Sequence, residues 1–238
     1  ATFKPPELRL RLLARGVSAA FDSRLGMAKP DCVRMRTIVT PELTLEPLCT
    51  SHAEAMFELL RDEAIYRYLD YSAPPSVQHL RDVYARLEAR MSPDGSDAWL
   101  NWVIRPRGQP LVGYVQATVS SSRSAHVAYI LASKYWGHGY AHGAMLAMLE
   151  YLASDYDVER CRATVEVENQ RSVRLLERLG FQLATERELK GVQLSMTERM
   201  FVRCLAPKDR DNAHDRIASD STRGAIPRAD GGSTKAGG

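Results

Sequence analysis

Between residues 37 and 205, apolar residues recur along the chain with two different periods. Alternation of apolar and polar residues is typical of half-buried strands, whereas spacings of three and four residues are typical of helices. The alternating pattern predicts strands at 43–48, 99–104, 111–119, 126–131 and 161–167, and two more near 181–187 and 197–205. The helical pattern predicts helices at 51–60, 77–91, 141–154 and 172–179. This order of elements predicts an α/β fold with one mixed sheet in a single domain.

Local signals mark some of these boundaries. Ser51 opens the first helix and Glu54 follows three residues later, which is the spacing of a capping box. Gly180 follows the last helix, as expected of a glycine just beyond a helix C-terminus, and Phe181 would then re-enter the core.

The two ends of the chain differ in composition from the middle. Residues 206–238 contain almost no large apolar side chains, so they cannot bury a core and we expect a disordered tail. Residues 1–36 are rich in arginine and poor in acid, and we expect an N-terminal extension that is mostly disordered or forms a short helix. The folded domain is therefore predicted at 37–205.

Composition and charge narrow the class of protein. The chain is 45% hydrophobic and 26% charged, which is ordinary for a globular protein. No apolar run is long enough to span a membrane, so no membrane partner is expected. Residues 37–205 carry 18 basic and 21 acidic side chains, which disfavours nucleic acid as a partner and suits a cationic substrate such as an amine. The cysteines form no CxxC pair, which predicts reduced thiols in a cytoplasmic protein: Cys32, Cys49, Cys161 and Cys204.

One candidate ligand-binding loop precedes the helix at 141–154. It contains Gly137 and Gly139, and small residues let a backbone approach a ligand closely. Unpaired N–H groups at a helix start attract anions, so the loop could cradle a pyrophosphate. The alternative is a glycine-containing turn before an ordinary helix, because the loop lacks the Lys-Ser/Thr of a P-loop and the third glycine of a dinucleotide fold.

A second candidate stretch runs from Glu168 to Phe181. Asn169 and Ser172 stand at the start of its predicted helix. Either residue could bind a ligand or simply cap the helix.

Taken together, the two stretches resemble the GNAT superfamily of N-acetyltransferases. The first is similar to the family's acetyl-CoA motif, Gln/Arg-x-x-Gly-x-Gly/Ala, with Trp136-Gly-His-Gly-Tyr-Ala141 in its place. The second is similar to the family's Asn-x-x-Ser-x-x-Leu-Leu-Glu-x-Leu-Gly-Phe helix. The resemblance covers 41–205 and is closest to the ribosomal-protein N-terminal acetyltransferase (RimJ/RimL-like) branch.

The chain departs from the family pattern at three positions. Trp136 stands where Gln or Arg is usual, and His142 stands where this branch usually has Glu. Leu176 occupies the position at which many relatives place a general-acid tyrosine, so another group must supply that proton.

The resemblance implies a twisted, mostly antiparallel sheet of six or seven strands, with helices on both faces. It also implies a splay between the fourth and fifth strands, here 126–131 and 160–167. The implied activity is transfer of an acetyl group from acetyl-CoA to a primary amine, either a protein N-terminus or a small molecule, by direct attack in a ternary complex. The alternative is a non-catalytic acyl-CoA-binding module, because the acid tyrosine is absent. The sequence does not decide whether the protein forms a homodimer.

The same resemblance implies the site residues. Those expected to bind the cofactor are Ile130, Leu131, Trp136, Gly137, His138, Gly139, Tyr140, Ala141, Asn169 and Ser172. Ser172 is also the candidate acid for the departing thiolate. Glu166 is the candidate base, directly or through water, with Glu168 and His126 as alternatives.

Two further groups of residues have more than one interpretation. His138 and His142 are four residues apart, a spacing that could hold a metal, but no third ligand is nearby and no metal is expected. Several aromatic residues could wall a substrate pocket or pack in the core: Trp99, Trp102, Tyr66, Tyr68 and Tyr71.

Overall fold

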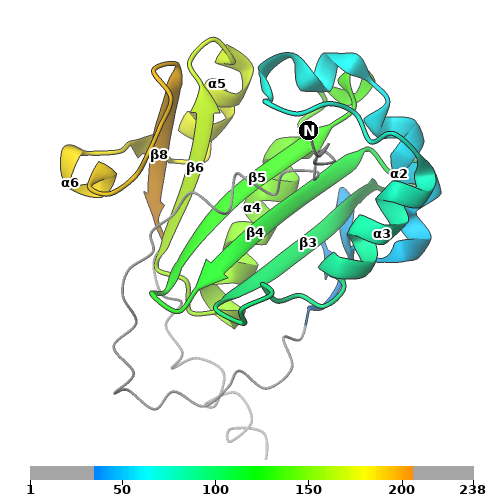
Figure 1. The fold of residues 1–238 in the computed structure, drawn as a ribbon, viewed down its shortest axis with the longest axis horizontal. Helices are drawn as coiled ribbons and strands as arrows, with labels where there is room; N and C mark the ends of the chain where they lie inside the picture. Colours follow the sequence, from blue (N-terminus) through cyan, green and yellow to red (C-terminus); the bar gives the residue numbers. More distant parts are fainter. Residues whose placement is uncertain (1–34, 206–238) are drawn as a thin grey trace, which may run out of the picture. The chain divides into compact units, whose positions relative to one another are not determined.

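The computed structural model describes residues 35–205, and the expectations for 1–34 and 206–238 lie outside the described residues. An eight-stranded sheet runs through the described part in the order β1-β2-β3-β4-β5-β6-β8-β7 (Figure 1). Its strands are β1 (Ile38–Val39), β2 (Leu43–Pro47), β3 (Asp97–Pro106), β4 (Gly113–Ser120), β5 (Ser124–Leu131), β6 (Arg160–Glu166), β7 (Gln182–Leu183) and β8 (Glu198–Cys204). Among the strands of residues 35–205, only β5 and β6 pair in parallel, which confirms a mixed, mostly antiparallel sheet.

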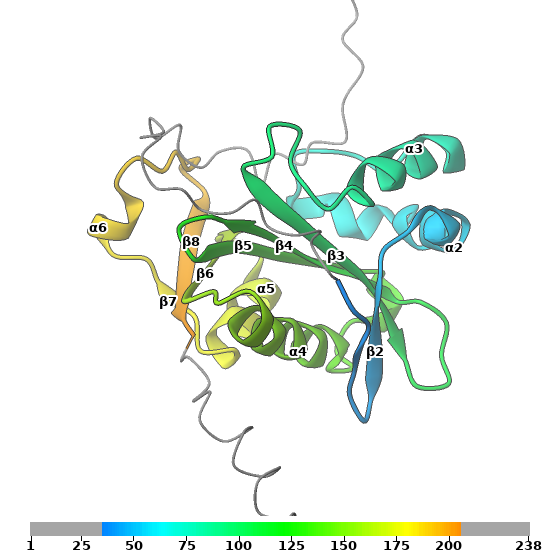
Figure 2. The same cartoon turned by 90° about the horizontal axis from the view of Figure 1, so that it is seen from below.

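Helices cover both faces of this sheet, as predicted (Figure 2). The α-helices are α2 (Ala53–Leu60), α3 (Val77–Leu87), α4 (Tyr140–Asp155), α5 (Gln170–Arg178) and α6 (Glu186–Leu189), and the 3-10 helices are η1 (Thr50–His52), η2 (Glu63–Tyr68) and η3 (Ser133–Tyr135). On one face, α4 and α5 enclose a core that includes Met145 and Leu176. On the other face, Met56 of α2 and Leu80 of α3 pack against Val103 of β3. The alternating side chains of one sheet thus supply two hydrophobic clusters.

The sheet has one strand more than the six or seven predicted. The additional strand, β1, pairs Ile38 with Leu45 and Val39 with Thr44. Two residues are too short to produce a detectable alternation, so β1 depends on its pairing with β2 rather than on a local pattern.

Several element boundaries also differ from the prediction. The first helix begins with η1, and its capping box joins Cys49 and His52 rather than Ser51 and Glu54. Glu54 instead forms an ion pair with Arg81 of α3. The second helix ends at Leu87 rather than at residue 91, because the chain turns out of the helix near Arg90, whose φ is +55°.

The strand expected near 181–187 is shortened to β7. Thr185 and Glu188 form a capping box that begins α6 immediately afterwards. In contrast, Gly180 has a φ of +77° and Phe181 is buried, so both expectations for the end of α5 are confirmed.

The predicted splay separates β5 from β6. The parallel pairing covers only Ser124–His126 against Arg160–Arg162, after which the two strands diverge (Figure 1). The C-terminal half of β5 therefore has β4 on one side and no β6 partner on the other. Within residues 35–205, no helix combines the length and hydropathy needed to cross a membrane.

Candidate active site

A cavity of about 1510 Å³ opens at the splay. Its walls come from β5, β6, the loop at 135–142, α5 and the segment 64–71 that contains η2. Most of the residues expected to bind a cofactor contribute to this lining: Ile130, Leu131, Trp136, Gly137, Gly139, Tyr140, Ala141, Asn169 and Ser172. The fold thus gathers two stretches that are well separated along the chain.

The free edge of β5 presents backbone groups to this cavity. Ala132 N–H donates to the Val112 carbonyl, and hydrogen-bonded pairs alternate along an antiparallel ladder. In this register the backbone of Ile130 faces β4, whereas the backbones of Tyr129 and Leu131 face the splay. A side chain on Gly113 of β4 would overlap the Ile130 carbonyl oxygen, in agreement with that direction. Tyr129 and Leu131, rather than Ile130, therefore offer polar backbone atoms at the open edge.

The glycine loop has the geometry of an anion cradle. Gly137 and Gly139 have φ values of +85° and +81°, and a Cβ on either would meet open space. Gly139 is the N-cap of α4, and the first intrahelical bond runs from Gly143 N–H to its carbonyl. The N–H groups of residues 140–142 precede that bond and are left unused by the helix. A helix start of this kind favours negative charge.

Trp136 contacts two neighbouring elements of the site, β5 and α5. Its indole N–H donates to the Leu131 carbonyl over 2.8 Å and so ties the end of β5 to the loop. The guanidinium of Arg171, from α5, lies 4.3 Å from the centre of the indole ring. A cation from α5 thus stands near the position at which the family motif carries its polar residue. The sequence did not single out Arg171, although it lies between the two motif residues Asn169 and Ser172.

The two histidines of the loop, His138 and His142, have different surroundings. His138 stacks on Tyr140 with ring centres 5.7 Å apart, and its Nδ1 lies 3.1 Å from the Trp136 carbonyl oxygen. His142 lines the cavity at the first turn of α4. Among the described residues, no three His, Cys, Asp or Glu side chains gather as a metal site would require.

Asn169 and Ser172 have different local roles. The Asn169 side chain accepts a hydrogen bond from Ser172 N–H at 3.2 Å, so Asn169 is the cap of α5. The Ser172 hydroxyl is not a cap. It accepts a 2.9 Å hydrogen bond from the Tyr129 phenol, which reaches across the splay from β5.

Burial raises the pKa of Tyr129 above its ordinary value of 10.0, although the Ser172 hydrogen bond and the charges of Arg171 and Arg178 oppose the rise. The phenol is therefore protonated at neutral pH and can act as a donor. The resemblance placed the backbone of Tyr129 at the open strand edge, but the sequence patterns missed its phenol as a candidate site group, because nothing local distinguishes this side chain from those of other strand tyrosines.

The acidic residues near the splay come from β6, β8 and the turn after β6. Glu166 lies directly opposite Glu198 of β8 in the sheet register, and both line the cavity together with Glu168. Like charges at opposed positions repel one another and attract cations. The sequence did not identify Glu198, because only the pairing of β6 with β8 brings it to the site.

His126 is the least suitable of the candidate bases. It is not among the cavity-lining residues, and burial lowers its pKa to about 4, with the nearby charge of Arg162 acting in the same direction. Its Nε2 lies 3.3 Å from the Thr164 hydroxyl. A buried imidazole with so low a pKa is a poor acceptor for an ammonium proton.

Comparison with known proteins agrees with this geometry. A family model described as an acetyltransferase (GNAT) domain matches residues 42–182, which is more than half of the chain. The chain belongs to the GNAT acetyltransferase family.

Relatives and solved structures agree with this membership. The protein p20 of Bacillus licheniformis, described as an uncharacterized N-acetyltransferase, is 25% identical over 150 residues, which are 62% of this chain and 83% of p20. A structure of RimL, a ribosomal L7/L12 α-N-protein acetyltransferase in complex with coenzyme A, matches with a TM-score of 0.59 and 21% identity, covering 71% of this chain and 98% of RimL. A spermidine N-acetyltransferase from Vibrio cholerae, in complex with CoA and spermine, matches with a TM-score of 0.57 and 20% identity over 71% and 98% of the two chains. At these identities the structures share the fold.

In this GNAT chain, the cavity also extends to the segment after α2. Tyr68 and Tyr71 line it, whereas Trp99 and Trp102 do not and pack instead within the two hydrophobic clusters. The Asp62 carboxylate accepts a 2.5 Å hydrogen bond from Ser133 N–H, which ties this segment to the chain just after β5. Leu176, where many relatives carry tyrosine, is 2% exposed and brings no polar atom to the cavity.

Proposed function

We propose that this protein transfers an acetyl group from acetyl-CoA to a primary amine, by direct attack of the amine on the thioester in a ternary complex. The observation that carries the proposal is the cavity at the splay, which joins the glycine loop to the acidic and tyrosine-lined side of the sheet. One continuous space could therefore receive two ligands that meet at the edge of β5. The coenzyme A complexes of RimL and of the spermidine N-acetyltransferase, which share the fold, support acetyl-CoA as the cosubstrate.

The cofactor would lie along the loop and the free edge of β5. Backbone N–H groups from Gly137 to Ala141 would hold its pyrophosphate. The outward backbone groups of Tyr129 and the N–H of Leu131, whose carbonyl already accepts from Trp136, would pair with its pantetheine arm, as a strand pairs with an edge. The Asn169 side-chain amide keeps its N–H donors available while its oxygen caps α5.

The acid of the reaction would be the Ser172 hydroxyl supported by Tyr129. Because Tyr129 donates to the Ser172 oxygen, the serine's own proton is free to point toward a departing thiolate. A proton lost from Ser172 would be replaced along this hydrogen bond. Tyr129 of β5 and Ser172 of α5 would thus supply the proton that a tyrosine at the position of Leu176 supplies in many relatives.

The acceptor amine would approach from the acidic side. An alkyl ammonium must lose a proton before it attacks, because its ordinary pKa is about 10. Glu166 would take this proton directly or through a water molecule, and Glu198 would add to the negative potential that attracts the cation. A protein N-terminus and a small amine would both satisfy these requirements.

A second candidate function is an acyl-CoA-binding module without turnover, which the apolar Leu176 favours. The two functions differ in thiol release measured with a panel of polyamines, aminoglycosides and peptides with free N-termini. Release that depends on acetyl-CoA and on one amine class supports the transferase. Cofactor binding without release favours the module.

Binding itself is measured by thermal unfolding, because a ligand that binds only the folded state stabilises it. At a hundredfold excess over Kd the gain is about 2.7 kcal/mol. For a chain of this size that raises Tm by about 5 to 10 °C. Dephospho-CoA and free adenine should raise it less. The absence of any shift at millimolar acetyl-CoA would exclude both candidate functions.

A further inference from the structure

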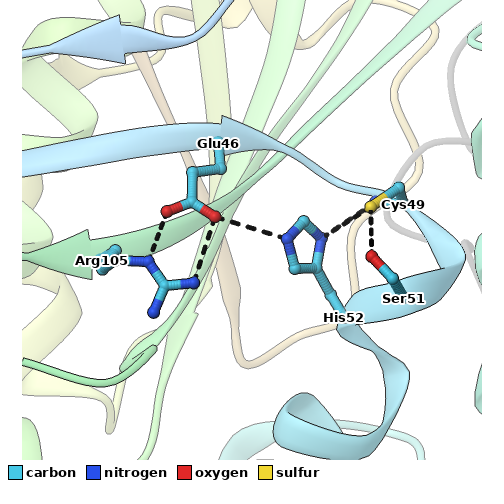
Figure 3. A network of polar contacts seen from close by, with 5 residues as sticks. All are labelled: Glu46, Cys49, Ser51, His52 and Arg105. Carbon is cyan, nitrogen blue, oxygen red and sulfur yellow. Dashed lines mark hydrogen bonds and ion pairs between the residues drawn. The ribbon is translucent and has the colours of Figure 1, made fainter.

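A second cluster of reactive side chains lies outside the cavity, where β2 ends and η1 begins (Figure 3). The Cys49 sulfur lies 3.3 Å from His52 Nδ1 and 3.0 Å from the Ser51 hydroxyl. On the far side of the imidazole ring, His52 Nε2 lies 3.4 Å from a Glu46 carboxylate oxygen. Thiol, imidazole and carboxylate thus stand in line, in the arrangement of an activated nucleophile.

The hydrogen bonds define the protonation of the imidazole. The Cys49 backbone N–H lies 3.1 Å from His52 Nδ1, and an amide N–H can only donate. Nδ1 therefore carries the lone pair, and in the neutral ring the proton lies on Nε2, which faces Glu46. The unprotonated nitrogen is the one beside the thiol, and its single lone pair faces both the Cys49 amide N–H and the thiol, so transfer of the thiol proton to Nδ1 must displace the amide hydrogen bond.

Glu46 is held in place by an arginine. Arg105 of β3 forms an ion pair with Glu46 of β2, with Nη2 3.2 Å from the carboxylate, and this hydrogen bonding lowers the pKa of Glu46. The carboxylate is therefore charged at neutral pH and can stabilise an imidazolium that forms beside it. The carboxylate and the arginine come from paired strands, so the sheet itself orients the imidazole.

We propose that Cys49 is a reactive thiol that forms mixed disulfides with small-molecule disulfides, with His52 as its base and Glu46 as the residue that positions the base. His52 Nδ1 takes the thiol proton as the sulfur attacks one sulfur of the disulfide. The new S–S bond forms at Cys49, the old one breaks, and the leaving thiolate takes the proton from the imidazolium. The Cys49 sulfur rises by one oxidation-state unit, the leaving sulfur of the small disulfide falls by one, and no further reagent is needed.

Two other cysteines of the described residues provide internal comparisons. Cys161 is 0% exposed, and burial raises its pKa to about 12, so it should not react in the folded protein. Cys204 on β8 is exposed, whereas Cys49 is only partly exposed. A higher rate at Cys49 than at Cys204 would therefore not come from better access to solvent.

The test compares two forms of the full chain. Cys32→Ser with Cys204→Ser leaves Cys49 as the reactive cysteine, and Cys32→Ser with Cys49→Ser leaves Cys204. Each form is treated with dipyridyl disulfide while thiopyridone release is followed, and with oxidised glutathione while intact mass is measured. We expect Cys49 to react at least about tenfold faster than Cys204 at neutral pH, because a positioned base typically contributes a hundredfold or more and the lower exposure of Cys49 offsets part of that gain. The difference should shrink at alkaline pH, where any thiol ionises unaided.

Two variants, each made in the form that retains Cys49, distinguish whether His52 acts as a base or only as a member of the capping box. His52→Asn keeps a side-chain oxygen that can accept the Cys49 N–H, so Tm should hold while the rate falls to that of Cys204. Glu46→Gln should give an intermediate rate. A Cys49 rate equal to that of Cys204, or a fast rate that survives His52→Asn, would overturn the proposal. If His52→Asn does not fold, an unchanged rate and pH profile in Glu46→Gln would overturn it instead.

Discussion

The Tyr129 phenol donates a 2.9 Å hydrogen bond to the Ser172 hydroxyl, and this bond joins β5 to α5 across the splay. The two residues are 43 positions apart in the sequence. Ser172 is therefore tied to the open strand edge at the point where the proposed reaction would take place. The same bond shows that the serine is not a helix cap, since Asn169 performs that role.

Ser172→Ala should lower kcat by about tenfold to a hundredfold while leaving the KM for acetyl-CoA nearly unchanged, as expected when an acid acts mainly in the transition state. The variant should also lose about 1 kcal/mol of stability, because it leaves a buried phenol without its partner. Tyr129→Phe should lower kcat in the same direction. Steady-state kinetics and thermal unfolding measure both effects.

A double-mutant cycle checks that the two hydroxyls act together. Adding Tyr129→Phe to Ser172→Ala should cost little further activity and should recover part of the lost stability, because both members of the bond are then absent. An unchanged kcat in Ser172→Ala would leave the thiolate to depart unaided or through a water molecule.

Asn169 offers a way to separate capping from cofactor binding. Asn169→Ala should lose about 1 kcal/mol of stability, because it removes the cap of α5. Asn169→Asp keeps the capping oxygen, so its Tm should stay near that of the parent. It loses the amide N–H donors, so its KM for acetyl-CoA should rise. Equal KM values for parent and Asn169→Asp would assign Asn169 to the helix cap alone.

Gly139→Ala should weaken both folding and cofactor affinity. Its φ of +81° makes any L side chain strained, by about 1 to 2 kcal/mol. An added methyl group would also stand where the proposed phosphates would approach the loop. A β-branched replacement such as Gly139→Val would be more strained still.

Gly108→Ala is the matched control for this prediction. Gly108 lies in the turn between β3 and β4, has a φ of +69° and also faces open space. It should show a similar loss of Tm with an unchanged KM for acetyl-CoA. If Gly139→Ala binds acetyl-CoA as tightly as Gly108→Ala, the loop is not the phosphate cradle.

His126 should make the fold sensitive to acid. Its pKa is lowered from 6.5 to about 4 in the folded protein, so the unfolded chain binds the proton more readily. Above the unfolded value His126 is neutral in both states and contributes nothing. As the pH falls through the window between these two values, the free energy of unfolding should decrease, by on the order of 3 kcal/mol in total.

Denaturant unfolding of the parent and of His126→Gln over this pH window measures the contribution. Carboxylates contribute equally to both proteins, so the difference between the two curves isolates the imidazole. Parallel curves would show that the imidazole is protonated in the folded state as easily as in the unfolded chain.

The sequence by itself predicted most strands and the four longer α-helices of this protein, and their order. Apolar periodicity is a local property, so it located the six strands of five or more residues, the region of β7 and the helices α2 to α5, and the two glycines marked the loop before α4. Boundaries that depend on contacts were wrong: Glu54 pairs with Arg81 of α3 instead of capping its own helix. The two-residue strand β1 carried too little pattern to be found.

Only the tertiary structure decided which side chains meet. The divergence of β5 from β6 directs Tyr129 toward Ser172, and the pairing of β6 with β8 places Glu198 opposite Glu166. Likewise, the pairing of β2 with β3 brings Arg105 to Glu46 and so completes the cluster around Cys49. These contacts follow from strand order and register, which depend on how whole faces are buried, and no local spacing records that choice.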